Sequence, residues 1–362
     1  MENFDSFLNN KGKNNADNNV VAMLDGIRNE DYYDPSNIYN ILYFNCKQFS
    51  KANKIFRKAC EDNKVNMFII DSDDKVCTEN GRYYVKTDDG KNIEINEGNT
   101  VAFFRNYSST KVVNTKKMIR NNSPILCSNP VSASRNTFNK YKTFNILDSK
   151  NVSTIPSLFI DGEIFEKNGL DNASKLKEYI TSKGYEFPVV LKVLTSSKGV
   201  GIFKCPDNSV LSSVLQYTIE KEEEGVIIQP CLDIDSDLRV HVLCSNFNPK
   251  TATDDDYVVI GSMRRHKAND DFRTNFSVGG EVEYADLTED EKKLAIDALK
   301  AVGGVWMGID ICHDKGTDKD YVIEINSTPG LTGICSTVAS DENPVYRIIA
   351  SIPQALDKSK SR

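Results

Sequence analysis

Apolar residues recur along the first third of the chain in short runs that alternate with polar segments. This pattern predicts a helix at 47–62 and strands at 38–43, 66–70, 83–86, 92–95 and 101–104. A strand, a helix and a second strand at this spacing form a right-handed βαβ unit. Asp88-Asp89-Gly90 is a typical turn between two strands of a hairpin. We therefore expect a first α/β domain over residues 37–131.

From residue 132 onward, the pattern predicts a larger domain in which strands and helices are mixed. Ser132 is a candidate N-cap of a helix that runs to about residue 147. Thr288 and Glu291 have the spacing of a capping box. Further helices are expected at 172–182, 209–221 and 289–302, and strands at 189–194, 200–203, 226–229, 238–243, 258–263, 305–311 and 321–325. Strands mixed with helices and hairpins indicate α+β architecture rather than one doubly wound sheet.

The two ends of the chain lack this patterning. Ten of the first forty residues are Asn, so residues 1–36 offer little apolar surface to offset the entropy of ordering. We expect a mostly disordered tail there. We expect the larger domain to cover 132–353, followed by a C-terminal tail at 354–362.

Composition excludes several classes of protein. The net charge of −7 provides no overall attraction for nucleic acid. There is no apolar run long enough to span a membrane, and the N-terminus lacks the features of a signal peptide. The nine cysteines are scattered without a CxxC pair, which argues against a disulfide framework or a zinc site. We expect a cytoplasmic protein that binds neither membranes nor nucleic acid directly.

Two carboxylates and an amide gather on the last predicted hairpin. Alternate residues of a strand share a face, so Val322, Glu324 and Asn326 should point the same way. In the preceding strand, Asp310 should share a face with Trp306. If the two strands pair, the three polar side chains converge, and such hard oxygen ligands suit magnesium shared with nucleotide phosphates. The alternative is a solvated face of an antiparallel hairpin.

A lysine followed by a glycine-containing turn marks a second candidate site. Lys192 lies on the strand predicted at 189–194, and Thr195-Ser196-Ser197-Lys198-Gly199-Val200-Gly201 follows it. The N–H groups and cations of such a turn can lie along a triphosphate, although Ser-Gly turns also simply join strands. The chain contains no GxxxxGK[ST], which excludes a P-loop. Lys140, taken alone, is a surface lysine on the helix predicted from Ser132.

Three further candidate groups lie between the turn and the hairpin. The backbone of Gln229-Pro230-Cys231-Leu232, after a predicted strand, can hydrogen-bond an adenine edge. Asp237 and Arg239 share a strand face. The basic run Arg264-Arg265-His266-Lys267 precedes Arg273-Thr274-Asn275, and these cations are either a clamp on phosphate and carboxylate groups or a solvated charge run.

Five segments, taken in order, resemble the ATP-grasp ligases of the RimK type, which add glutamate to the C-terminus of a ribosomal protein. They are PVVLKVLTSSKGVG, VIIQPCLDIDSDLRV, RRHKANDDFRTNFSVGG, MGIDIC and VIEINSTPGL. The resemblance covers about residues 124–352 and implies the ATP-grasp fold, in which two α+β subdomains clasp ATP, with a lid at about 150–230. The domain at 37–131 resembles the family's pre-ATP-grasp domain. Pro230 stands where the family usually has Glu, and Ser277 and Val278 stand where it has His and Arg.

The resemblance also implies roles for individual residues. Lys140 and Lys192 would hold the α- and β-phosphates of ATP, and Arg264 and Arg273 would be the catalytic cations that face the transferred phosphoryl group. Two magnesium ions, or manganese in their place, would be bound by Asp310, Glu324 and Asn326. The other nucleotide-binding residues would be Thr195, Ser196, Ser197, Lys198, Gly199, Gly201, Gln229, Pro230, Cys231, Leu232, Asp237 (toward the ribose), Arg239, Thr274 and Asn275.

The implied activity is that of an ADP-forming carboxylate–amine ligase that works through an acyl phosphate. It would add an amino acid such as glutamate to the carboxylate of a protein or peptide. The alternatives are a glutathione-synthetase-like ligase for a small acid, and a non-catalytic nucleotide-binding or structural protein. A homo-oligomer is compatible with the sequence. Because the basic run supplies more cation than ATP with two magnesium ions requires, we expect Arg265 or Lys267 to face an acidic substrate group.

Overall fold

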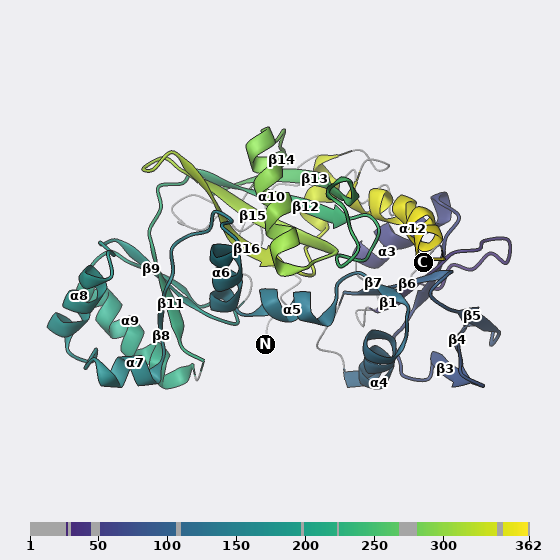
Figure 1. The fold of residues 1–362 in the computed structure, drawn as a ribbon, viewed down its shortest axis with the longest axis horizontal. Coiled ribbons are helices and arrows are strands. Elements are labelled where there is room, and N and C mark those ends of the chain that lie inside the picture. The colour runs from purple at the N-terminus through teal and green to yellow at the C-terminus, as the bar shows by residue number, and fades with distance from the viewer. Residues whose placement is uncertain are drawn as a thin grey trace, which may run out of the picture.

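A computed structural model shows three parts placed side by side (Figure 1). A first α/β unit lies at one end, a central five-stranded sheet lies in the middle, and a smaller unit, here called the lid, lies at the other end and covers residues 158–230. Within the part of the chain that is described, no helix is both long and apolar enough to cross a membrane. The structure describes residues 27, 30–44, 51–105, 110–196, 199–222, 224–267, 281–338 and 343–360.

The first unit is built on parallel strands in the order β2-β1-β6-β7, and a small antiparallel sheet, β3-β4-β5, extends from it. The predicted strand–helix–strand succession and the predicted hairpin are confirmed, since the parallel strands of the first are buried and the two strands of the hairpin pair. Strand β3 was not predicted. The elements are β1 (Asn40–Phe44), α3 (Lys51–Asp62), β2 (Asn66–Ile69), β3 (Val76–Glu79), β4 (Arg82–Lys86), β5 (Asn92–Ile95), β6 (Thr100–Phe104), α4 (Val113–Lys117) between a 3-10 turn (Thr110–Val112) and a π turn (Met118–Asn122), and β7 (Leu126–Cys127).

The central sheet is antiparallel, with the strand order β14-β13-β12-β15-β16. Helix α10 (Glu289–Val302) covers one face, where its Leu299 and Ile309 of the sheet belong to one buried cluster. The helix begins with the predicted capping box of Thr288 and Glu291. The remaining elements of this part are β12 (Ser236–Cys244), a 3-10 turn (Asp254–Asp256), β13 (Tyr257–His266), β14 (Val282–Tyr284), β15 (Trp306–Asp314), β16 (Lys319–Asn326) and α11 (Thr332–Thr337).

The helix predicted from Ser132 is broken into two, α5 (Val131–Phe138) and α6 (Lys140–Ser149). The prediction of Ser132 as the N-cap is wrong, because α5 begins at Val131 and its N-cap is Pro130. The break falls at Asn139, whose backbone is extended and whose side chain accepts a hydrogen bond from the N–H of Lys142 at 3.0 Å. An Asn side chain competes with the helix backbone in this way and favours a cap over a helix interior. The break directs the N–H of Lys140 toward Leu194 O, at 3.0 Å.

The last helix, α12 (Pro344–Lys360), packs against α3 of the first unit. It continues past the boundary expected at residue 353, because Ala355 and Leu356 are buried in a cluster shared with the strands of that unit. The hydroxyl of Tyr39 also reaches the carboxylate of Asp357, at 3.2 Å. The two ends of the described chain therefore share one core.

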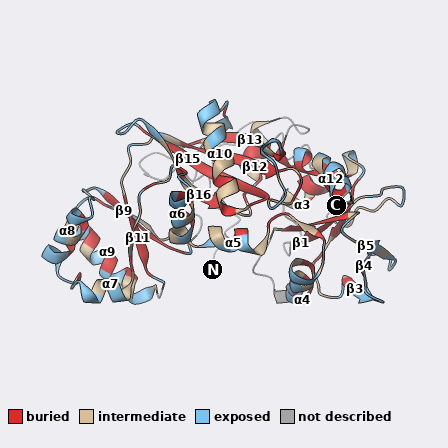
Figure 2. Ribbon diagram, viewed as in Figure 1, coloured by how far each residue is buried: buried red, intermediate tan, exposed pale blue. Residues whose placement is uncertain are grey.

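The lid has a sheet in the order β10-β9-β11-β8 and a buried core of its own. Figure 2 shows the buried residues along its strands, while its helices expose their outer faces. The elements are β8 (Leu158–Ile160), α7 (Gly162–Lys167), α8 (Ala173–Ser182), β9 (Val189–Val193), β10 (Ile202–Cys205), α9 (Asn208–Lys221) and β11 (Val226–Pro230). The predicted strands and helices of this region are confirmed within a few residues, whereas β8 and α7 were not predicted.

Both connections between the lid and the central part rest on the β15–β16 hairpin. In the incoming connection, Ser153 O accepts from the N–H of Val322 at 2.9 Å. In the outgoing connection, the N–H of Asp233 donates to Asp314 Oδ1 at 2.9 Å, and Asp233 O accepts from the N–H of Lys315 at 3.0 Å. The hairpin is therefore a common support for the two connecting segments.

Candidate active site

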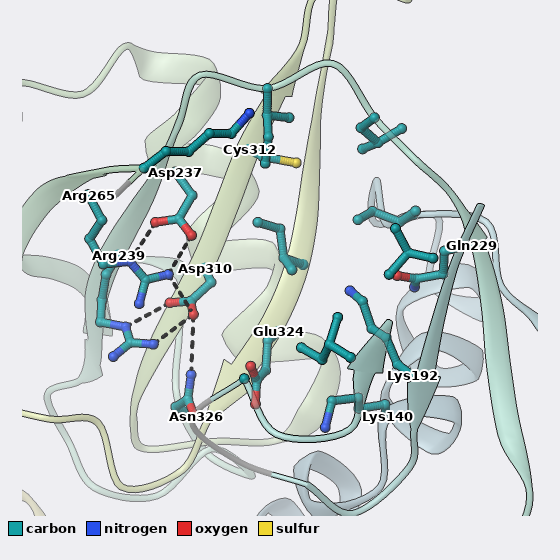
Figure 3. Close-up of a pocket in the computed structure, with 18 of the residues that line it drawn as sticks. Lys140, Lys192, Gln229, Asp237, Arg239, Arg265, Asp310, Cys312, Glu324 and Asn326 are labelled. Atoms are coloured by element: carbon teal, nitrogen blue, oxygen red, sulfur yellow. Dashed lines mark hydrogen bonds and ion pairs between the residues drawn. The ribbon is translucent and has the colours of Figure 1, made fainter. Parts of the chain in front are cut away.

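A cavity of about 900 Å³ lies between the lid sheet and the central sheet. Lys192 and Gln229 line it from the lid, and Asp310, Glu324 and Asn326 line it from the central sheet (Figure 3). The structure thus brings together residues that are far apart in the sequence and that we expected at one site.

Strand alternation determines which side chains reach this cavity. In the register of the sheet, Asp237 pairs with Arg265 on one side and with Cys312 on the other, and all three side chains line the cavity. Arg264 pairs with Leu238, which packs under α10 on the opposite face. Arg264 is not among the lining residues, and its Nη1 donates to Ser236 Oγ at 3.1 Å. The arginine that β13 presents to the cavity is Arg265, not the expected Arg264.

A β-bulge shapes the hairpin that carries the two carboxylates. Asp310 pairs with Glu324, but the next residue, Ile311, pairs with Val322, so Ile323 is extra. The bulge shifts the alternation by one residue. The expectation that Val322 points the same way as Glu324 is therefore wrong. Val322 lies in the buried cluster beneath α10, and Ile323 lines the cavity beside Glu324.

Asp310 is held by two arginines (Figure 3). Arg239 donates to its two oxygens through Nε at 2.8 Å and Nη2 at 2.7 Å, and Arg265 Nη2 donates to Oδ2 at 2.9 Å. Burial raises the pKa of Asp310, but the guanidinium groups of Arg239 and Arg265 outweigh burial and hold the pKa below its ordinary value. Asp310 is therefore an ionised carboxylate, and Oδ1 keeps a lone pair for a further partner.

Arg265 is buried between two carboxylates. Its side chain is 3% exposed, and its Nη2 also donates to Asp237 Oδ2, at 2.6 Å. The expectation that Arg265 or Lys267 faces an acidic substrate group is therefore weakened for Arg265, which already has two acidic partners. Lys267 lines the cavity, and for Lys267 the expectation stays a prediction.

Glu324 lies opposite two lysines, Lys140 and Lys192 (Figure 3). Burial and the neighbouring Asp310 raise the pKa of Glu324, and no hydrogen bond from a described residue offsets this rise. Burial lowers the pKa of Lys192 to about 8 and also lowers that of Lys140, whose Nζ donates to Ser196 O at 2.8 Å. Burial of these charged groups is not fully offset by their partners. A bound cation beside the two carboxylates would stabilise their charge, and phosphate groups beside the two lysines would stabilise theirs.

The carboxylates and amide suit magnesium. Asp310, Glu324 and Asn326 offer only oxygen ligands, and Mg²⁺ is typically bound by one or two carboxylates together with substrate phosphates. Two carboxylates and one amide are too few for a resident ion held by protein alone. The donor set therefore fits a metal that arrives with a nucleotide.

The opposite end of the cavity suits an adenine ring. Gln229 is 5% exposed, its Nε2 donates to Ser157 Oγ at 2.7 Å, and its Oε1 has no hydrogen-bond partner. A buried acceptor without a donor is costly, and the exocyclic amino group of adenine can supply the donor. The following residues, Pro230, Cys231 and Leu232, also line this end.

Only part of the predicted phosphate-binding turn, residues 195–201, lines the cavity. Ser196 and Gly199 line the cavity, whereas Thr195 and Gly201 do not. The expected residues that lie outside the described part of the chain are Ser197, Lys198, Arg273, Thr274 and Asn275, and Ser277 and Val278 lie there too.

Sequence reasoning missed several lining residues. Lys204 lies on β10 two residues after Ile202, which also lines the cavity, so alternation could have found it. Thr328 and Gly330 follow the metal-ligand candidate Asn326 within the segment VIEINSTPGL, which was the available signal. Cys312 gave no signal beyond its place two residues after Asp310.

Residues 137–352 match the family of RimK-like ATP-grasp domains. A probable alpha-L-glutamate ligase of Pasteurella multocida (strain Pm70) is 29% identical over 220 residues, which are 60% of this chain and 61% of the relative. The coenzyme gamma-F420-2:alpha-L-glutamate ligase of Methanococcus maripaludis is 27% identical over 213 residues, 58% of this chain and 65% of the relative. The chain thus spans about three-fifths of the length of these relatives.

Solved structures share the fold. A Chryseobacterium gregarium RiPP-associated ATP-grasp ligase, in complex with ADP and a leader and core peptide, superposes with a TM-score of 0.62 at 14% identity, covering 89% of this chain and 97% of that one. D-alanyl-alanine synthetase A from Vibrio cholerae has a TM-score of 0.58 at 14% identity, covering 90% and 99%. These similarities show the expected α+β ATP-grasp fold.

Proposed function

We propose that this chain, which belongs to the family of RimK-like ATP-grasp domains, is an ATP- and magnesium-dependent carboxylate–amine ligase. The observation that carries the proposal is the composition of one cavity. It has two carboxylates and an amide at one end, two desolvated lysines in the middle, and an unpaired buried acceptor at the other end. These are the groups that a metal, a polyphosphate and an adenine require, in the order in which Mg–ATP presents them.

In the proposed complex, the adenine amino group donates to Gln229 Oε1, and the backbone of residues 230–232 holds the ring edge. Lys140 and Lys192 bind the α- and β-phosphates, and these anions would add to the attraction of Glu324, which alone does not offset the burial of the two lysines. Asp310, Glu324 and Asn326 hold the metal, for which we propose two magnesium ions with manganese as a substitute. The metal would neutralise charge on the phosphates and on the oxygens around the transferred phosphoryl group.

The proposed reaction has two steps. An oxygen of the substrate carboxylate attacks the γ-phosphorus of ATP, the bond to the β-phosphate oxygen breaks, and ADP leaves. The amine then attacks the carbonyl carbon of the acyl phosphate, loses a proton, and displaces phosphate to give an amide. Positioning supplies most of the catalysis, so a protein nucleophile is not required. Arg239 and Arg265 act by holding Asp310 ionised and correctly oriented.

For the substrates, we propose L-glutamate as the amine and a peptide or protein C-terminus as the carboxylate. The names of the relatives, which are alpha-L-glutamate ligases, support the amino acid. The peptide complex of the Chryseobacterium structure supports a peptide carboxylate. The cavity does not favour a small acid through any particular residue.

The test is release of ADP by the purified protein with Mg–ATP, L-glutamate and a panel of carboxylates that contains peptides and small acids. We expect ADP release that needs both a carboxylate and L-glutamate, with a peptide as the best carboxylate. Glu324→Gln is the matched inactive variant. Binding of Mg–ADP without turnover on any pair would favour a nucleotide-binding protein, and turnover on small acids alone would favour a metabolite ligase.

A further inference from the structure

The segment that follows β11 is held at two points, each by a different part of the molecule. On the lid side, the N–H of Cys231 donates to Pro188 O at 3.1 Å. On the side of the central sheet, the N–H of Asp233 donates at 2.9 Å to Oδ1 of Asp314, the last residue of β15. Leu232 lies between these two anchors and lines the cavity.

Asp314 is a buried carboxylate that joins this segment to the hairpin turn. It is 4% exposed, and its Oδ2 accepts from the N–H and the hydroxyl of Thr317 at 3.1 and 2.7 Å. Burial raises the pKa of Asp314, but the hydrogen bonds from Thr317 and from the N–H of Asp233 outweigh burial and hold the pKa below its ordinary value. An ionised acceptor makes a stronger hydrogen bond than a neutral one. The N–H of Lys315 also donates to Asp233 O at 3.0 Å, so both backbone groups of Asp233 are fixed.

The segment held in this way is the one to which we assign the adenine edge. Adenine presents an amino donor and a ring-nitrogen acceptor side by side, whereas guanine presents an oxygen and an N–H there. Gln229 Oε1 matches the amino group, and among the described residues the N–H of Leu232 has no partner, so it can match the ring nitrogen. Gln229 is fixed by its pairing with Val190 in the lid sheet, but Leu232 belongs to no strand. Its N–H can recognise the base only if the anchors on either side hold it in place.

We propose that Asp314, which lies outside the cavity, is a positioning residue for base recognition: it holds Asp233 and thereby keeps the N–H of Leu232 in place for the adenine ring. This inference rests on the proposed function and deepens it by assigning the choice of base to a residue that does not touch the nucleotide. The hairpin that carries Asp314 also carries Asp310 and Glu324. The base-binding segment and the metal-ligand candidates are therefore anchored to the same pair of strands, which fixes the spacing between the two ends of the nucleotide.

The test is calorimetric titration of the purified protein with Mg–ADP, Mg–GDP and Mg–pyrophosphate. Asp314→Ala removes the acceptor of the Asp233 N–H and should weaken the binding of Mg–ADP about tenfold. Mg–pyrophosphate has no base, so its affinity should change less than about twofold. The preference for Mg–ADP over Mg–GDP should fall about tenfold, whereas a general loss of stability would leave this ratio unchanged.

Thr317→Val is the matched control, since it removes one hydrogen bond to the other oxygen of Asp314 and leaves the bond to Asp233 in place. All three affinities should stay within about twofold of the wild type. An unchanged ratio of Mg–ADP to Mg–GDP affinity in Asp314→Ala, or an equal fall of this ratio in Thr317→Val, would overturn the inference and leave the proposed function intact.

A second measurement uses the wild-type protein alone, so it does not depend on the folding of a variant. In hydrogen exchange resolved to single residues, the amide of Asp233 should already be protected without nucleotide, whereas the protection of the Leu232 amide should rise at least about tenfold when Mg–ADP is added. Exchange of the Asp233 amide at the rate of an unprotected amide, or no change at Leu232 with Mg–ADP bound, would overturn the inference. Failure of the wild type to bind Mg–ADP would overturn the proposed function itself.

Discussion

At the scale of single residues, the two carboxylates of the candidate metal site have opposite electrostatic surroundings. Burial and the neighbouring Asp310 raise the pKa of Glu324. A carboxyl whose pKa is higher in the folded protein than in the unfolded chain destabilises the fold at neutral pH, where it is ionised. We predict that Glu324→Gln keeps or raises the melting temperature. It should lower the rate of ADP release on the order of 100-fold, because the metal that would stabilise charge on the transferred phosphoryl group loses one of its carboxylate ligands. Near wild-type ADP release would remove Glu324 from the metal site.

Asp310→Asn should behave differently, because Asp310 is the counter-ion of Arg239 and Arg265. Removing one member of a buried ion pair typically costs about 3–5 kcal/mol. We predict that activity and the free energy of unfolding fall together, as measured by ADP release and denaturant unfolding. Asp254→Asn is the matched control, since Asp254 is exposed and pairs with Lys300, and it should cost less than about 1 kcal/mol. Equal free energies of unfolding for the two variants would contradict the ion pairing of Asp310 with Arg239 and Arg265.

Lys192 predicts a pH dependence of nucleotide binding. Burial lowers its pKa in the free protein to about 8, so its charge is lost as the pH rises through 8. Phosphates require the charged form, and the affinity for Mg–ADP should fall about tenfold per pH unit above 8. Lys192→Arg remains charged and should give a shallower profile than the wild type between pH 7 and 9.5 in calorimetric titrations, because Lys140 is then the remaining phosphate-binding lysine whose pKa burial lowers. A flat profile in the wild type would contradict the assignment of Lys192 to the phosphates.

At the scale of elements, the cap between α5 and α6 places a phosphate-binding candidate. Asn139 caps α6, and Lys140 is the first residue of that helix. Asn139→Ala should lower the free energy of unfolding by about 1 kcal/mol and weaken Mg–ADP, because Lys140 loses its fixed position. Asn139→Ser keeps a side-chain oxygen that can cap and should retain both properties. Denaturant unfolding and calorimetry check the pair, and identical behaviour of the two variants would refute the role of the cap.

Local patterns predicted those elements that local forces determine. Thr288 and Glu291 correctly predicted the start of α10, because both partners of the capping box lie within one turn of the helix. The bulge at Ile323 was missed because it depends on pairing between two strands, which sequence alternation alone does not reveal. For the same reason alternation separated Arg264 from Arg265 but could not say which faces the cavity. The pairing of Arg265 with Asp237 across the sheet decides that.

At the scale of the whole molecule, the C-terminal helix completes the core of the first unit. Leu356 is buried in a cluster that includes strands β1 and β6. We predict that Leu356→Ala costs about 2–5 kcal/mol of stability by leaving a cavity. Ile38 is 69% exposed, and Ile38→Ala should change stability by less than about 0.5 kcal/mol. If thermal unfolding of the two variants coincided, the helix would not be part of that core.

The support of both connecting segments on the β15–β16 hairpin has a mechanical consequence. The hairpin holds both segments that connect the lid to the central part, and it also carries Asp310, Glu324 and Asn326. Because Lys192 and Gln229 lie in the sheet of the lid, a rotation of the lid would move them together and would leave Asp310, Glu324 and Asn326 fixed relative to one another. Such a rotation would open the proposed site between the side that carries Gln229 and the side that carries the metal-ligand candidates. A nucleotide bound as proposed would contact both sides and hold them together, and ADP would keep these contacts after the terminal phosphate is transferred.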